Sequence, residues 1–369
     1  MIKPKRIAVA LSGGVDSSVA ALLLKWAGFD VTAVFMKNWT KSKISPYCTE
    51  AADRKDALRV AAKLKIPFEV WDFEADYRKR VIDVFFAEYK AGRTPNPDVL
   101  CNREIKFGLF LDRARKRGFD GMATGHYARV RSDRSGHYHL LSGLDTNKDQ
   151  TYFLVDLDQT TLPFVRFPVG ELTKPEVRRL AKQASLPTAD KPDSQGICFV
   201  GPVNLFNFLK TRLPSQPGPI VTSEGRIVGT HEGLSFYTIG QRQGLGIGGA
   251  GIPYYVASKD FKHNRLIVGH GRRDPILYAS SCVINKPHWI IQKPKLPFKC
   301  QVRIRYRQPL QTAGIGRLSF PPQMRRGRGW SSSKAVKVVF ANPQWAVTPG
   351  QYAVFYQGEE VVGGGVIDK

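Results

Sequence analysis

The stretch Ile7-Ala8-Val9-Ala10-Leu11-Ser12-Gly13-Gly14-Val15-Asp16-Ser17-Ser18 decides the fold of the N-terminal part of this chain. Its first half is short, apolar and rich in β-branched residues, which predicts a buried strand. The serine and two glycines that follow predict a tight turn. A helix is expected next, ending at Gly28, with an apolar stripe of Val19, Leu22, Leu23 and Trp26. Strand, glycine turn and helix N-terminus together form an anion site, because backbone N–H groups point outward and the helix dipole favours negative charge.

The glycine turn is not a Walker loop. No Lys-Ser or Lys-Thr pair follows it, so the lysine that usually contacts the β and γ phosphates is absent. The string SGGVDS at 12–17 instead resembles the PP-loop of the ATP pyrophosphatase group, which implies cleavage of ATP between its α and β phosphates. Under this resemblance Asp16 helps to hold magnesium near the phosphates. The alternative is a turn that merely begins a helix, and the position of the full string between a strand and a helix favours nucleotide binding.

Composition bounds the class of protein. The chain has 369 residues, of which 42% are hydrophobic and 24% charged, which predicts a globular protein of two or three domains. Lys and Arg number 56 against 31 Asp and Glu, a formal charge of +25. Such an excess favours a polyanionic partner, most simply a nucleic acid, and the alternative is a generally basic surface.

Nothing in the sequence predicts secretion or membrane insertion. The apolar run 7–11 is too short for a signal peptide, and no stretch is long enough to span a bilayer. The five cysteines include no CxxC pair, so we expect neither a zinc ribbon nor a disulfide framework and favour a reducing cytoplasm.

From residue 1 to about 200, predicted strands alternate with predicted helices. Strands are expected at 31–36, 68–71 and 119–124, and helices at 49–64, 77–89 and 98–117. We base the first of these helices on Ala52, Leu58 and Ala62. This rhythm predicts an α/β fold with a doubly wound, mostly parallel sheet. Ligands of such sheets bind beyond the carboxyl ends of the strands, where the PP-loop, Met36 and Gly125 all lie. The alternative for Met36 is a core residue at a strand end.

The helical rhythm stops after a proline-rich stretch at 213–220. We therefore expect three domains, at 1–212, 213–276 and 277–369. The second is a small β-rich domain with strands at 227–229, 254–256 and 265–268. The third is a β-barrel-like domain with strands at 298–306, 335–341, 351–356 and 361–367. This last domain has 14 Lys and Arg against 3 Asp and Glu, so we expect it to bind a nucleic acid.

Two cysteines lie in polar motifs. Cys101 follows Asn96-Pro97-Asp98 at the expected start of a helix, where a thiol is biased toward the thiolate. Asp98 there would orient or deprotonate a substrate. The alternative is a capping aspartate beside a small buried thiol. Cys198 lies in the glycine-bearing loop 193–201, as a carrier or as a structural residue, and its spacing from Cys101 leaves both open.

Eight strings occur along the chain: the PP-loop, NPDVLCNREIKF (96–107), ATGHYARV (123–130), KDQTYFL (148–154), DSQGICFVG (193–201), GLSFYTIGQRQGLGIGG (233–249), IRYRQ (304–308) and AVTPGQYAVFY (346–356). In this order they resemble the tRNA-specific 2-thiouridylase family over nearly the whole chain. The resemblance implies a PP-loop ATPase domain, a small central domain and a C-terminal β-barrel-like domain. It also implies insertion of sulfur at C2 of the wobble uridine of certain tRNAs.

The resemblance also implies roles for single residues. The positions that would bind ATP are Ala10, Leu11, Ser12, Gly13, Gly14, Val15, Asp16, Ser17, Met36 and Gly125. Asn96, Pro97 and Asp98 would touch the target base, while Cys101 matches the family's nucleophile and Cys198 its persulfide carrier. The positions that would contact tRNA are His126, Lys148, Asp149, Gln150, Arg305, Tyr306 and Gln351. The alternatives are a core-facing loop histidine for His126, and an ordinary strand of a basic barrel for Arg305 and Tyr306.

The implied reactants are ATP with nucleotide-bound Mg²⁺, without a permanent metal or organic cofactor. The implied partners are a tRNA with a wobble uridine and an upstream protein that donates persulfide sulfur. We expect a monomer in the cytoplasm and a transient Cys101–Cys198 disulfide during turnover. Cys48, Cys282 and Cys300 match nothing catalytic.

Two other classes of function stay open at this point. A PP-loop ligase for a small metabolite would explain the first domain but neither the two cysteine motifs nor the basic β domains. A non-enzymatic RNA-binding protein would tolerate the loss of Asp16, Cys101 and Cys198. The segment 321–333 departs from the family pattern, and the resemblance gives this basic, flexible-looking loop no role.

Overall fold

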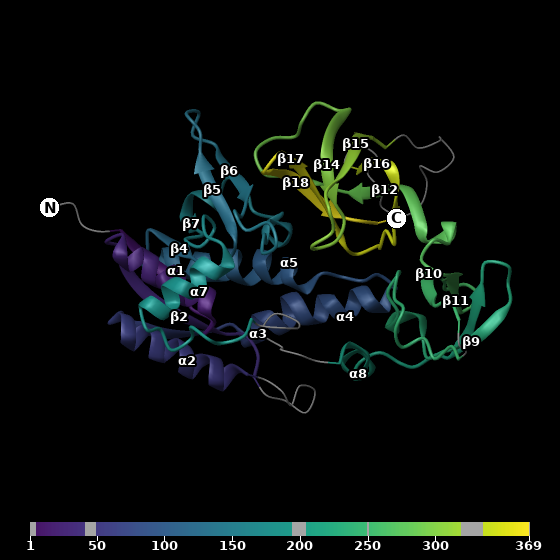
Figure 1. The fold of residues 1–369 in the computed structure, drawn as a ribbon, viewed down its shortest axis with the longest axis horizontal. Coiled ribbons are helices and arrows are strands. Elements are labelled where there is room, and N and C mark those ends of the chain that lie inside the picture. The colour runs from purple at the N-terminus through teal and green to yellow at the C-terminus, as the bar shows by residue number, and fades with distance from the viewer. Residues whose placement is uncertain (1–4, 41–48, 194–203, 249–250, 319–334, 369) are drawn as a thin grey trace.

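A computed structural model describes residues 5–40, 49–193, 204–248, 251–318 and 335–368. Figure 1 shows an α/β part that holds the N-terminal half, a β-rich domain at the C-terminus above it, and a small β domain to one side. This is the predicted fold class. Among the described residues, no helix combines the length and apolarity needed to cross a membrane.

The α/β part is built on a five-stranded sheet in the order β3-β2-β1-β4-β7, with parallel pairing throughout. Its strands are β1 (Arg6–Ala10), β2 (Asp30–Lys37), β3 (Phe68–Asp72), β4 (Gly121–Ala123) and β7 (Val165–Arg166). Alternate residues of a strand face opposite sides. Accordingly Ala8 and Ala10 belong to one apolar core, while Ile7 and Val9 belong to another. The sheet is therefore covered on both faces, as predicted.

One face carries α1 (Val15–Trp26), α2 (Glu50–Leu64) and α7 (Lys174–Gln183). The helical spans of α1 and α2 are as predicted, but the expected apolar stripes are partly wrong. Trp26 is 61% exposed, whereas Leu24 is buried, and in α2 Leu58 is exposed. The buried side chains of α2 are Ala57, Val60, Ala61 and Leu64. This set has the i, i+3, i+4, i+7 spacing of a helix face, which the expected set of Ala52, Leu58 and Ala62 lacks.

The other face carries two long helical runs. The first consists of α3 (Glu74–Tyr77), the π-helix η1 (Arg78–Ile82) and α4 (Asp83–Lys90). The second consists of α5 (Pro97–Cys101), the π-helix η2 (Asn102–Phe110) and α6 (Leu111–Lys116). Sequence predicts both spans as helices, and the π-helical turns within them are an addition.

The small domain follows α8 (Leu205–Lys210) and contains a four-stranded sheet in the order β10-β11-β8-β9. Its strands are β8 (Gly218–Thr222), β9 (Ile227–His231), β10 (Tyr254–Asp260) and β11 (Arg265–His270). The three strands expected here are present. The proline-rich stretch expected as a linker also supplies the start of β8.

Short 3₁₀ turns lie at Thr151–Leu154, Leu162–Phe164, Leu234–Phe236 and Pro275–Leu277.

The C-terminal sheet recruits a hairpin from the first half of the chain. Its order is β12-β16-β15-β14-β17-β18-β6-β5, with β13 paired to β18. The C-terminal strands are β12 (Tyr278–Asn285), β13 (His288–Trp289), β14 (Phe298–Arg303), β15 (Gln311–Arg317), β16 (Ala335–Trp345), β17 (Tyr352–Gln357) and β18 (Glu360–Val366). The hairpin is β5 (Ala128–Ser132) and β6 (Tyr138–Ser142), which joins the sheet through the antiparallel pair Val361 and Leu140. This continuous sheet links the α/β part to the β-rich domain.

Candidate functional site

The PP-loop turn lies between β1 and α1, where the backbone approaches another helix closely. Gly13 has φ +76°, a left-handed conformation that favours glycine, and a Cβ there would lie 2.2 Å from the carbonyl oxygen of Asp53. Ser17 turns its hydroxyl back into the loop, where it accepts from the N–H of Ser12 at 3.2 Å and donates to the carbonyl of Gly14 at 3.1 Å. The loop is therefore a small, preorganised turn at the N-terminus of α1.

Two further residues expected at the nucleotide lie at strand ends around this turn. Gly125 follows β4, and a Cβ there would lie 2.5 Å from the backbone nitrogen of Ser17. Met36 is buried near the end of β2, beside β1 in the sheet. The structure therefore brings Gly125 against the first turn of α1 and places Met36 on a neighbouring strand, as the parallel topology predicts.

Asp16, in the first turn of α1, is held by two residues far away in the sequence. Lys174 Nζ lies 2.7 and 2.8 Å from its two carboxylate oxygens. The Tyr127 hydroxyl donates to Asp16 Oδ1 at 2.8 Å. Burial and the neighbouring Asp16 charge both raise the pKa of Tyr127, so this phenol stays protonated as a donor. The loop thus has a lysine beside it, although the sequence of the loop itself lacks one.

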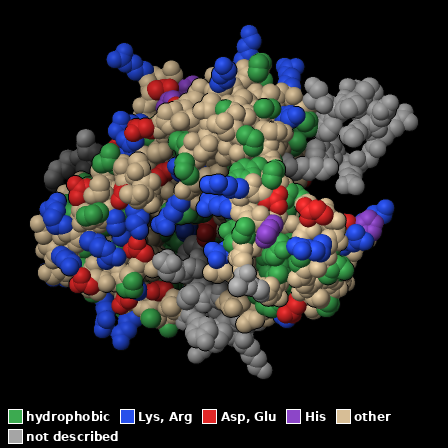
Figure 2. All heavy atoms as spheres, turned by 45° about the vertical axis from the view of Figure 1, so that its right-hand side comes forward, with side chains coloured by type: hydrophobic (Ala, Val, Ile, Leu, Met, Phe, Trp, Pro, Cys, Tyr) green, Lys and Arg blue, Asp and Glu red, His purple; other side chains and the backbone are tan. Residues whose placement is uncertain are grey.

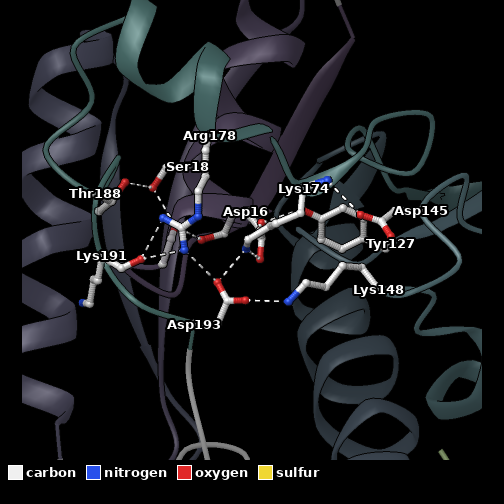
Figure 3. A network of polar contacts seen from close by, with 12 residues as sticks. Asp16, Ser18, Tyr127, Asp145, Lys148, Lys174, Arg178, Thr188, Lys191 and Asp193 are labelled. Atoms are coloured by element: carbon white, nitrogen blue, oxygen red, sulfur yellow. Dashed lines mark hydrogen bonds and ion pairs between the residues drawn. The ribbon is translucent and has the colours of Figure 1, made fainter. Parts of the chain in front are cut away.

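Asp193 lies close to Asp16, and the two carboxylates share Lys174 as a partner (Figure 3). Its carboxylate pairs with Lys148 at 2.7 Å, Lys174 at 2.8 Å and Arg178 at 3.1 Å. Burial alone would raise the pKa of Asp193, but the hydrogen bonds from Lys148 and Lys174 outweigh it and lower the pKa to about 2. Three cations therefore converge on Asp193, and Lys174 contacts both aspartates.

The sequence interpretation did not single out four members of this polar network as candidate site residues: Lys174, Tyr127, Arg178 and Asp193. One local signal was present: Thr173 and Glu176 form a capping box, which marks Lys174 as the first residue of a helix. That signal predicts α7 but not its neighbour, because 158 residues separate Lys174 from Asp16.

A second group of expected residues begins α5. The Asn96 side chain caps the helix by accepting from the N–H groups of Asp98 at 3.1 Å and Val99 at 3.2 Å, and Pro97 is in the first turn. Asp98 is half-buried, whereas Cys101 has 0% exposure and packs with Val99 and Leu100 in the apolar core. The predicted helix start, with proline in the first turn, is confirmed, and the thiol is covered in this conformation.

Cys198 lies in residues 194–203, which are outside the described residues, as are Cys48 and the basic segment 321–333. Asp193 is the last described residue before that segment. Through Asp193, the charge network therefore reaches the last described residue before the segment that contains Cys198.

Residues expected to contact tRNA in the first half of the chain are engaged within the protein. His126 is 9% exposed, and its Nδ1 lies 2.6 Å from Thr124 Oγ1. Burial, assisted by the charge of Lys106, lowers the pKa of His126 well below its ordinary value, so its ring is neutral. Asp149 is buried and pairs with Arg303 at 3.0 Å, and Gln150 Oε1 accepts from the N–H of Tyr127 at 3.1 Å. Lys148 pairs with Asp193, as described above.

The three expected contacts in the C-terminal domain also have partners within the protein. Arg305 donates to the carbonyl of Ile239 at 2.7 Å and to Thr348 Oγ1 at 2.6 Å. The Tyr306 ring lies 4.4 Å from that of Phe153. Gln351 donates to backbone carbonyls that precede α5. These groups therefore join separate parts of the chain.

The arrangement suits a phosphate ligand next to a basic surface. Figure 2 shows Lys and Arg side chains gathered around a hollow on one face. Backbone N–H groups at the start of α1 and the nearby lysines together favour an anion. Within the described ranges, no cluster of three or more His, Cys, Asp or Glu side chains could hold a metal ion.

Comparisons with known proteins cover nearly the whole chain. Family models described as the tRNA methyl transferase HUP domain, the tRNA methyl transferase PRC-barrel domain and the aminomethyltransferase beta-barrel domain match residues 5–202, 206–270 and 327–367. A solved structure of a 4-thiouridine synthetase–RNA complex with bound ATP has 18% identity and a TM-score of 0.37, covering 54% of this chain and 46% of that one.

Two curated relatives give a far stronger match. The tRNA-specific 2-thiouridylase MnmA of Geobacillus thermodenitrificans is 49% identical over 99% of this chain and 95% of its own. The protein of the same name from Shouchella clausii is also 49% identical, over 99% of this chain and 96% of its own. With half of the residues identical across almost the full length of both chains, this chain belongs to the tRNA-specific 2-thiouridylase family.

Proposed function

We propose that the protein catalyses ATP-dependent 2-thiolation of the wobble uridine in the anticodon of tRNA. The observation that carries the proposal is the 49% identity to proteins named tRNA-specific 2-thiouridylase over 99% of this chain. The proposed division of labour places ATP chemistry in residues 1–212 and tRNA binding chiefly in the basic residues 277–369, with 213–276 between them. We place the enzyme in the cytoplasm as a monomer.

The proposed ATP site comprises residues 10–17, Met36 and Gly125. The N–H groups at the start of α1 would bind phosphate oxygens, and Lys174 would supply the cation that a Walker loop carries within its own sequence. Asp16 suits Mg²⁺, which commonly takes one or two carboxylates together with substrate phosphates. Mg²⁺ held there would neutralise phosphate charge. The phosphates and Asp193 would then compete for Lys148, Lys174 and Arg178.

The proposed first step is adenylation of the base. The uridine leaves the anticodon stack, as the targets of base-modifying enzymes do, and lies near Asn96, Pro97 and Asp98. Its O2 attacks the α phosphorus of ATP, the bond to the β-phosphate oxygen breaks, and pyrophosphate leaves. The O2 atom, a poor leaving group as a carbonyl oxygen, becomes part of AMP, which leaves readily.

The proposed second step transfers sulfur. A persulfide-bearing donor protein loads Cys198, and the terminal sulfur attacks C2 of the base as the C2–O bond breaks and AMP leaves. The Cys101 thiolate then attacks the inner sulfur of Cys198. The electron pair of the sulfur–sulfur bond stays on the thiolated base, and a Cys101–Cys198 disulfide forms. An external thiol reductant restores both cysteines.

A cysteine series tests this proposal. Cys198→Ser is expected to keep tRNA binding and tRNA-dependent release of pyrophosphate but to form no 2-thiouridine. Cys300→Ser is the matched control, because Cys300 is buried in β14, and it is expected to keep thiolation. Normal thiolation by Cys198→Ser in a sulfide-free assay would remove the carrier role.

A further inference from the structure

The two residues before the Asn96 cap are held by a loop of the C-terminal domain. Gln351 Nε2 donates to the carbonyl oxygens of Thr94 at 2.8 Å and Pro95 at 3.2 Å. In return, the N–H of Thr94 donates to the carbonyl of Pro349 at 2.9 Å. Three hydrogen bonds therefore fix the backbone from which α5 starts.

The fit between these segments leaves no room for a side chain. Gly350 has φ +92°, and a Cβ there would lie 2.8 Å from both the nitrogen and the oxygen of Thr94. The loop is itself anchored beside β18, because Gly350 donates to the carbonyl of Ile367 at 2.8 Å and Ile367 donates to that of Gln351 at 2.7 Å. The loop is therefore hydrogen-bonded both to the end of the C-terminal sheet and to the residues just before α5, and it fixes one relative to the other.

Arg305 connects the small β domain to the loop that carries Gln351. Its guanidinium bridges the carbonyl of Ile239 and the hydroxyl of Thr348, and the Trp345 ring lies beneath it at 5.5 Å. Burial lowers the pKa of Arg305 from an ordinary value of 12.5, and an arginine stays charged in proteins. Thr94 also donates directly to the Thr238 hydroxyl at 3.3 Å. All three domains thus meet at Thr94.

The segment fixed in this way leads directly into the proposed chemistry. Asn96 caps α5, whose next residues include Asp98 and Cys101. Displacement of reacting groups by about 1 Å can lower a rate by about 100-fold. The amide nitrogen of Gln351 already donates to two carbonyls, so its side chain has only the amide oxygen left to hydrogen-bond an RNA.

We propose that Gln351, braced by Arg305, is a positioning residue that sets the start of α5 and hence the placement of Asp98 and Cys101. The catalytic part of this inference rests on the proposed thiolation function. The structural part concerns only the joint between Gln351 and α5, and it can be tested without tRNA.

The kinetic test uses Gln351→Glu, which keeps the size of the side chain but cannot donate to the two carbonyls. We expect kcat for thiolation to fall about 10- to 100-fold while the Kd for tRNA stays within about twofold. The control is Arg307→Ala, which removes an exposed cation two residues after Arg305 and is expected to weaken tRNA binding with kcat retained. A higher tRNA Kd for Gln351→Glu with kcat unchanged at saturating tRNA would overturn the proposal.

The second test measures alkylation of single cysteines by iodoacetamide in the protein alone, with peptide mass spectrometry as the readout. We expect Gln351→Glu to speed alkylation of Cys101 but not of Cys282 or Cys300, which are buried in the C-terminal sheet. Unchanged alkylation of Cys101, or equal acceleration at all three thiols, would overturn the proposal, the latter because it indicates general destabilisation. If the wild-type protein thiolated no tRNA, the proposed function would fail. The alkylation test would still report whether Gln351 fixes the start of α5.

Discussion

Lys174 places its Nζ 2.7 and 2.8 Å from the two carboxylate oxygens of Asp16, a residue 158 positions earlier in the chain. The pair joins the first turn of α7 to the first turn of α1 at the end of β1. This ion pair therefore joins the N-terminal turns of the two helices beside the PP-loop.

Lys174→Met is expected to lower tRNA-dependent pyrophosphate release by about 100- to 1,000-fold, the usual cost of losing one donor that stabilises charge in a transition state. Steady-state pyrophosphate release with saturating tRNA and ATP measures this. Lys182→Met on the same helix is the control, because Lys182 pairs with Asp190 on the exposed surface at 3.0 Å. Equal activity of the two variants would remove Lys174 from the ATP site.

Gly125→Ala tests the packing behind the PP-loop. The added Cβ would lie 2.5 Å from the nitrogen of Ser17, so the first turn of α1 must shift. We expect a loss of about 1–3 kcal/mol in the free energy of unfolding, together with loss of ATP cleavage. Urea unfolding and pyrophosphate release measure the two effects.

Gly314→Ala is the control for that substitution, because among the described residues no atom beyond its two chain neighbours lies within 4 Å of the Cβ it would add. It is expected to leave both quantities nearly unchanged. Wild-type ATP cleavage by Gly125→Ala would show that the contact between Gly125 and α1 does not support the site.

Sequence predicts those parts of the fold that depend on residues close together along the chain. β1, the turn at Gly13 and α1 follow from a local pattern, and the parallel order then gathers Met36 and Gly125 near the loop. Trp26 shows the limit within one helix. It fits an apolar stripe by type, but tertiary packing buries Leu24 instead.

Long-range relationships account for what sequence missed. The pairing of Leu140 in β6 with Val361 in β18 joins strands more than 200 residues apart, and no local period encodes that register. The same holds for Lys174 beside Asp16 and for Gln351 against Thr94. The family resemblance implied a role in tRNA contact for Gln351, Arg305 and Asp149. Only the structure shows that these side chains connect separate parts of the chain.

The buried pair Arg303–Asp149 is expected to stabilise the joint between β14 and the KDQ motif at 148–150. Its side chains are only 14% and 4% exposed, and removal of one partner from a buried pair costs about 3–5 kcal/mol. Arg303→Met and Asp149→Asn should each lower the free energy of urea unfolding by roughly that amount, with the double variant losing less than the sum.

The control for the buried pair is Arg131→Met, which breaks an exposed pair with Glu171 at 3.1 Å. Such surface pairs contribute about 0–1 kcal/mol. Strictly additive losses in the Arg303 and Asp149 cycle would contradict a direct coupling between those two residues.

His139 predicts a pH dependence of the joint between β6 and β18. Partial burial alone would lower its pKa, but hydrogen bonds to Asp133 and Glu360 outweigh it and raise the pKa above the ordinary 6.5. A raised pKa in the folded state means that the contribution to stability is complete below pH 6.5 and is lost as pH rises through the folded-state pKa.

His139→Gln should therefore be less stable than wild type below pH 6.5, and the difference should close as the pH rises. Urea midpoints of both proteins from pH 5.5 to 9 measure it. His137→Gln, an exposed neighbour on the same hairpin, is the control. A difference that grows with pH would give the interaction the opposite sign.

The most direct test of the central claim is nucleoside mass spectrometry of a cognate tRNA incubated with the purified protein, Mg²⁺-ATP and a persulfide donor. We predict a 2-thiouridine derivative at the wobble position that forms only with ATP and disappears in Cys101→Ser and Cys198→Ser. ATP cleavage without any thiolated nucleoside would contradict the account and favour a ligase that modifies a small metabolite.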